Sequence, residues 1–177
     1  PEVYPKPDEW QRKEMLAGEK ESLGFYITGH PLDRYQGDIS RYANATTGDL
    51  EKLAKPPRDP SQGRPPADEA DAAIAGIVSE YRERPTKSGN GRMAFFQLQD
   101  QLGQVEVVVF PKTFEKLSGT LPPNDPVLAT GRIVDEGEGG EHSYRFHLVD
   151  LVPLARVREQ KTTRLHIMLN ADLVSKD

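Results

Sequence analysis

Apolar and polar residues alternate along five short stretches between residues 73 and 153. Alternation with a period of two is typical of β strands that bury one face. A tight turn at Gly103 separates the second and third stretches, which predicts a hairpin. Residues 111–117 predict a short helix that has proline in its first turn. The five predicted strands are Ala73–Arg84, Met93–Asp100, Val105–Phe110, Val127–Val134 and Ser143–Val152.

The predicted order over roughly 80 residues is three strands, a helix and two further strands. This is the element order of an OB-fold. We therefore predict a mainly β protein, in which residues 72–153 form a five-stranded Greek-key barrel with a short helix between strands 3 and 4. On the second strand, alternation turns Phe96 into the core together with Leu98 and the valines of the third strand. The same alternation turns Phe95 outward.

A helical connector and a linker are predicted before the barrel. A helix runs from Asp8 to about Ile27, and shorter helices or turns follow over Asp33–Tyr42 and Thr47–Leu53, which makes residues 1–54 the connector. Residues 55–71 hold five prolines and alternating charges, which indicates a mobile, solvated linker.

Residues 154–177 predict the start of a further domain, with a first strand at the apolar run 165–169. The chain opens on Pro1 without a methionine. We therefore expect a piece of a longer protein.

Composition limits the function classes. The formal net charge of the 177 residues is −5, so any nucleic-acid binding must come from a local patch. Cysteine is absent, which excludes disulfides and cysteine-based zinc sites and is typical of a reducing cytoplasm. No apolar run is long enough for a membrane span. The four histidines lack metal-ligand spacing and no nucleotide-binding or nucleophile motif is found, so we expect no catalytic residue, metal or cofactor in this chain.

The candidate site is the usual oligonucleotide face of an OB-fold, made by strands 2 and 3 and two of the loops. An outward aromatic such as Phe95 can stack on a base, although it can also pack under a loop. The loop after the first strand carries a cluster of cations beside Ser88-Gly89-Asn90-Gly91, which lets a phosphate approach, although ordinary surface charge is the alternative. The candidate nucleic-acid-binding residues are Arg82, Arg84, Lys87, Arg92, Phe95, Gln97 and Gln99.

Acidic residues argue against tight binding. Residues 72–153 hold eight lysines and arginines against eleven aspartates and glutamates, a net charge of −3. The predicted loop Asp135–Glu141 contributes four of these carboxylates, which repel phosphate. We expect a weak binding module that depends on a stronger neighbour.

Two segments resemble one protein family. The run Glu19–Tyr35, with Leu-Gly-Phe-Tyr-Ile-Thr-Gly-His-Pro-Leu at its centre, closely resembles a signature of bacterial DNA polymerase III alpha subunits. Arg92–Asp100 and Val105–Pro111 resemble the OB-fold that follows that signature. The resemblance covers roughly residues 8–153, and this chain departs from it in a longer Pro-rich linker and in the acidic loop.

The resemblance implies a DNA-directed DNA polymerase of chromosomal replication as the parent, in the bacterial cytoplasm, with its catalytic aspartates and Mg²⁺ bound elsewhere. It implies contacts with the sliding clamp and the clamp-loader tau subunit through neighbouring regions, the latter through the domain that begins at residue 154. The resemblance also implies that the barrel binds the single-stranded template without sequence preference. The candidate residues would make these contacts. A protein-interaction module within the replisome and a tRNA anticodon-binding barrel remain as alternatives.

Overall fold

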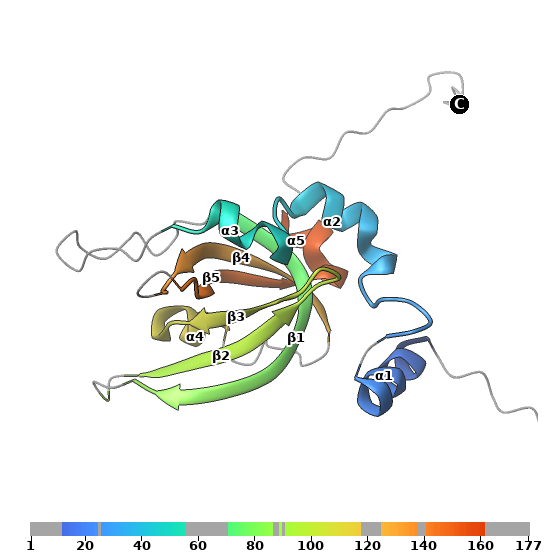
Figure 1. The fold of residues 1–177 in the computed structure, drawn as a ribbon, viewed down its shortest axis with the longest axis horizontal. Coiled ribbons are helices and arrows are strands. Elements are labelled where there is room, and N and C mark those ends of the chain that lie inside the picture. The colour runs from blue at the N-terminus through green and yellow to red at the C-terminus, as the bar shows by residue number, and fades with distance from the viewer. Residues whose placement is uncertain are drawn as a thin grey trace, which may run out of the picture.

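Five strands form a closed barrel in the computed structural model, which describes residues 12–24, 26–55, 71–86, 89, 91–117, 125–137 and 141–161 (Figure 1). Neighbouring strands follow the order β1-β2-β3-β5-β4. β3 and β5 run parallel, and the other pairs are antiparallel. The strands are β1 (Ala72–Pro85), β2 (Arg92–Gln99), β3 (Gln104–Val109), β4 (Pro126–Asp135) and β5 (Tyr144–Pro153).

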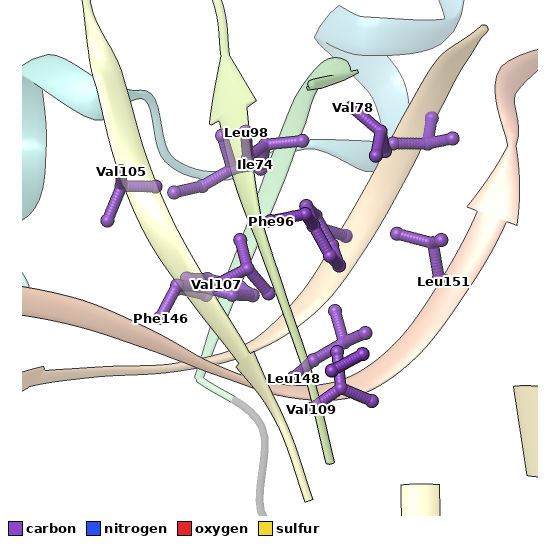
Figure 2. Close-up of a cluster of buried hydrophobic side chains, with 14 of the residues drawn as sticks. Ile74, Val78, Phe96, Leu98, Val105, Val107, Val109, Phe146, Leu148 and Leu151 are labelled. Carbon is purple, nitrogen blue, oxygen red and sulfur yellow. The ribbon is translucent and has the colours of Figure 1, made fainter. Parts of the chain in front are cut away.

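The barrel confirms the predicted OB-fold, including the short helix between the third and fourth strands. That helix is α4 (Pro111–Leu117), and Leu117 and Phe114 pack against the barrel core. Side chains from all five strands fill the interior (Figure 2). Phe96 is 1% exposed and Leu98 is fully buried, as alternation along the second strand predicts.

A second apolar cluster lies outside the barrel, against the first half of β1. Ile77 packs there with Leu32, Leu154 and Val157, so this half of β1 is buried on both faces. The covering elements are the 3₁₀ turns Asp33–Tyr35 and Leu154–Arg156 with the helices α2 (Gln36–Tyr42) and α5 (Val157–Lys161). The chain that enters the barrel and the chain that leaves it therefore pack together on one side of it.

The connector has the predicted helices, with one difference. Helices α2 and α3 (Leu50–Leu53), each preceded by a 3₁₀ turn, lie within the two predicted ranges. Helix α1 (Arg12–Leu23) ends earlier than the predicted Ile27, because Gly24 takes a φ of +81°, a conformation that favours glycine after a helix. Its predicted start at Asp8 lies outside the described residues.

The two ends of the predicted linker lie together. Lys55 bridges to β4 at Val134 and forms an ion pair with Asp71, where the barrel begins. Residues 56–70, and with them the predicted mobility of the linker, lie outside the described residues, as does the predicted strand at 165–169. Within the described ranges no helix is long and apolar enough to cross a membrane.

Candidate nucleic-acid interface

A β-bulge in β1 decides which side chains reach the outer face of the barrel. Ser79 lies opposite Gln97, and Arg82 lies opposite Phe95, so β1 has one extra residue between these pairs. Glu80 within the bulge has a φ of +53°, which is uncommon for a residue other than glycine. The extra residue reverses the alternation of β1 and turns Arg82 to the same side as Phe95.

Arg82 and Arg84 lie on β1, within the range of the predicted strand Ala73–Arg84. β1 continues to Pro85, and Arg84 pairs with Met93 of β2. The two strands run side by side as a long ribbon at the lower left of Figure 1. Both arginines are exposed, and the ribbon fixes their backbone beside Phe95 more firmly than a loop would.

The outer face carries a row of paired residues across four strands, in the order Arg82, Phe95, Val108 and His147. Phe95 is partly buried, and the guanidinium carbon of Arg82 lies 5.6 Å from its ring centre, within the range of a cation–π contact. The ring of His147 meets Phe110 edge to face, with centroids 5.0 Å apart. Val108 is 4% exposed, so the exposed part of the row is made of the partly buried rings of Phe95 and His147, with Arg82 at its border.

A chain of ion pairs lies beside this row. Glu106 of β3 pairs with Arg82 of β1 and, at 3.0 Å, with Nε of Arg145 of β5. Arg145 also pairs through Nη1 with Glu136 at 2.5 Å, and Nε2 of His147 lies 3.2 Å from the same carboxylate. We call these five residues, Arg82, Glu106, Arg145, Glu136 and His147, the charge chain.

Burial lowers the pKa of His147 below its usual value, against the opposing pull of Glu136. At neutral pH His147 is therefore an uncharged ring, and the charge chain holds two cations and two anions.

Arg92 lies on the other side of the ribbon. It pairs with Pro85 in register, one position away from Met93, so its side chain points away from the side of Phe95. There it forms an ion pair with Glu83 at 3.0 Å. Glu83 also accepts a hydrogen bond from the hydroxyl of Tyr81, whose pKa is raised to about 12, first by burial and then by this carboxylate.

The remaining candidate residues differ in their positions. Gln97 lies opposite Glu106 and belongs to the open part of the face. Gln99 pairs with Ile77, whose side chain is covered by the second cluster, so Gln99 lies where the open face ends. Lys87 lies outside the described residues.

The acidic loop after β4 is less repulsive than its sequence indicates. The Asp135 carboxylate lies 2.5 Å from Nδ1 of His142 and accepts hydrogen bonds from the backbone of Ser143 and Gly137. These contacts, with His142 first, lower the pKa of Asp135 to about 2. The contact with Asp135 in turn raises the pKa of His142, whose ring stacks on Tyr144. Glu136 forms an ion pair with Arg145 in the charge chain, and Glu141 is exposed.

Sequence reasoning missed four members of the charge chain as site residues, namely Glu106, Glu136, Arg145 and His147. Alternation through the hairpin at Gly103 places Glu106 beside Gln97, so the sequence pattern alone could have identified Glu106 as a residue of this face. Arg145 and His147 reach the face through the parallel pairing of β3 with β5, which joins strands that are not consecutive. Across the described part of the chain, no group of three or more His, Cys, Asp or Glu side chains is arranged to hold a metal ion.

Comparison with known proteins agrees with this fold. The family described as "OB-fold nucleic acid binding domain" matches residues 72–154. DNA polymerase III subunit alpha of Pseudomonas aeruginosa is 31% identical over 173 residues, which are 97% of this chain and 13% of that protein. The chain is thus similar to DNA polymerase III alpha subunits over almost its whole length.

Further DNA polymerase III alpha subunits match over a shorter range. The Thermus aquaticus subunit is 37% identical over 124 residues, which are 70% of this chain and 9% of that protein. This chain thus spans about an eighth of the length of the Pseudomonas relative. Among solved structures, the SSB domain of a Synechococcus protein aligns with a TM-score of 0.40 and 17% identity over 46% of this chain and 91% of that one, too distant a likeness to bear on function.

Proposed function

We propose that this chain is a segment of a bacterial replicative DNA polymerase alpha subunit and that its barrel binds single-stranded DNA weakly and without sequence preference. The observation that carries the proposal is the outer-face row, where Phe95 is flanked by Arg82 and by Val108. An aromatic ring at a cationic border is the arrangement on which single strands stack. Arg84 and Gln97 extend the same face, whereas Arg92, on the other side of the ribbon, is a weaker candidate than its sequence position indicates.

The parent protein, in this proposal, is a DNA-directed DNA polymerase of the bacterial cytoplasm. Its catalytic residues and Mg²⁺ are supplied by other parts of that protein, and this segment positions template DNA. The sliding clamp and the clamp-loader tau subunit are proposed to contact neighbouring regions.

Binding to a fluorescent single-stranded oligonucleotide, followed by anisotropy at low salt, tests the proposal. Phe95→Ala is expected to weaken binding about tenfold, since one stacked base contributes about 1–3 kcal/mol. Leu102→Ala, a truncation at the exposed tip of the β2–β3 hairpin, is the control and should bind like the wild type. Equal affinities of the wild type and Phe95→Ala would show that DNA does not bind on the outer face.

A protein-interaction module is the second candidate, because the charge chain neutralises cations that a DNA-binding face would leave available. Absence of any DNA binding at low salt and high protein concentration would favour it. A tRNA anticodon-binding barrel is the third candidate, and preferential binding of tRNA over a DNA oligomer would favour that one.

A further inference from the structure

Glu106 holds together two arginines that come from different parts of the barrel. Its Oε1 pairs with Nη2 of Arg82, and its Oε2 pairs with Nε of Arg145 at 3.0 Å. β1 and β5 are separated on this face by β2 and β3, so the carboxylate bridges almost the full width of the outer face. Two guanidiniums that converge on one carboxylate have the geometry that also binds a phosphate.

Exposure shows that the two cations can reach an outside ligand. The side chains of Arg82 and Arg145 are 46% and 39% exposed, whereas the side chain of Glu106 is 20% exposed. The carboxylate therefore lies deeper than the guanidiniums. An anion that approaches from solvent meets the cations first and competes with Glu106 for them.

We propose that Glu106 is a built-in competitor that occupies the phosphate site of Arg82 and Arg145 and thereby keeps the single-strand affinity of this face low. The inference rests on the proposed function. It assigns a regulatory role to a carboxylate, and it makes the weak binding a property of one side chain and not of the net charge of the barrel. Glu136 acts in the same way on Arg145 at the edge of the face.

The competition has a simple physical basis. A bound phosphate must displace Glu106 from two cations, and the displaced carboxylate then remains beside the phosphate and repels it. Replacement by glutamine keeps the size of the side chain and removes both ion pairs. Arg82 is then free for the sugar-phosphate backbone, and Arg145 is held by Glu136 alone.

Glu106→Gln is therefore expected to bind single-stranded oligothymidylate about tenfold more tightly than the wild type at low salt, as one or two added phosphate contacts would produce. The slope of the logarithm of the binding constant against the logarithm of salt concentration should steepen by about 0.7 for each added phosphate contact. Glu159→Gln is the matched control, because it makes the same charge change on α5, which packs against the second cluster.

A double substitution separates competition from a general charge effect. In the Glu106→Gln background, Arg82→Gln should remove most of the gain, because Arg82 makes the phosphate contact that the first substitution releases. Thermal unfolding of each variant checks that the barrel is folded. If Glu106→Gln does not fold, Glu136→Gln replaces it and should bind about threefold more tightly than Glu159→Gln.

The failures of the two proposals differ. If the wild type binds DNA and Glu106→Gln binds no more tightly than Glu159→Gln, the competitor role is overturned and the binding function stands. If neither the wild type nor Glu106→Gln binds at low salt, the binding function itself is overturned, and the competitor role with it. Equal gains in Glu106→Gln and Glu159→Gln would assign the effect to net charge and also overturn the competitor role.

Discussion

Two carboxylates of the β2–β3 hairpin have opposite kinds of partners. Asp100, just after β2, is 8% exposed and accepts hydrogen bonds from the backbone of Thr47, Leu102 and Gly103 at 2.7, 2.8 and 3.0 Å. It accepts a fourth, at 2.5 Å, from the hydroxyl of Thr47. Glu106, on β3, is paired with two arginines that are exposed to solvent.

The difference separates a structural carboxylate from one that a ligand can displace. The donors of Asp100 are neutral groups of the hairpin and of the connector, so its contacts fix the hairpin tip against residue 47 and leave nothing for a ligand to take over. The partners of Glu106 are charged and open to solvent, so another anion can replace it. Burial and the type of hydrogen-bond donor therefore indicate that the hairpin tip at Asp100 supports the fold. The region of β3 at Glu106 is the part that binds a ligand.

Asp100→Ala tests the structural end and has the largest expected effect. The substitution leaves the hydroxyl and backbone of Thr47 without their buried acceptor. Since a buried hydrogen bond to a charged group contributes about 1.5–3 kcal/mol, the free energy of unfolding should fall by about 3 kcal/mol. Urea denaturation measures it, with Leu102→Ala as the control at the same tip. A loss below about 1 kcal/mol would contradict the structural role of Asp100.

Arg145→Gln tests the binding end. It leaves Glu106 with Arg82 alone and Glu136 with His147 alone, so two carboxylates on the face lose a shared cation. Single-strand affinity at low salt should fall about fivefold to tenfold, close to 1 kcal/mol, with little change in urea stability. Arg156→Gln, on the exposed turn after β5, is the control for net charge. Equal effects of the two substitutions would show that the loss of affinity follows net charge and not the ion pairs of the charge chain.

The acidic loop gives the smallest effect, and it is a pH effect. The contact with Asp135 raises the pKa of His142 above its ordinary 6.5, while the pKa of Asp135 falls from 3.8 to about 2. The His142 contribution to stability is therefore full below pH 6.5 and is lost as the pH rises through the raised value. The Asp135 contribution is full above pH 3.8 and is lost as the pH falls through about 2.

Titration of the imidazole of His142 by NMR measures this link. In Asp135→Asn the pKa of His142 should move down toward 6.5, because its main partner loses its charge. His147 serves as an internal reference, since burial sets its lowered pKa. An unchanged His142 titration in the variant would show that the two side chains do not interact in solution.

The pattern of the sequence predicted the barrel well because alternation and turn residues are local signals. The five strands, the helix at Pro111–Leu117 and the opposite directions of Phe95 and Phe96 all follow from them. The bulge at Glu80 does not follow, because alternation continues through it in the sequence. Without the bulge, Arg82 would point toward the core side and could not border Phe95.

The charge chain and the Asp100 contacts depend on packing between distant segments. Thr47 belongs to the connector, and residues 47 and 100 meet only when the connector packs against the hairpin. Arg145 meets Glu106 only through the pairing of β3 with β5. Neither contact can be predicted from the local sequence. The outward direction of the Glu106 side chain can be predicted from alternation.

We expect single-stranded DNA to lie on the outer face beside Phe95 and not at the hairpin tip. Titration with an oligothymidylate, followed by backbone amide NMR shifts, locates the bound strand. Shifts should concentrate at Arg82, Phe95 and Arg145, and those of Thr47, Leu102 and Gly103 should stay unchanged. Shifts centred on the hairpin tip, with none at Phe95, would contradict this expectation.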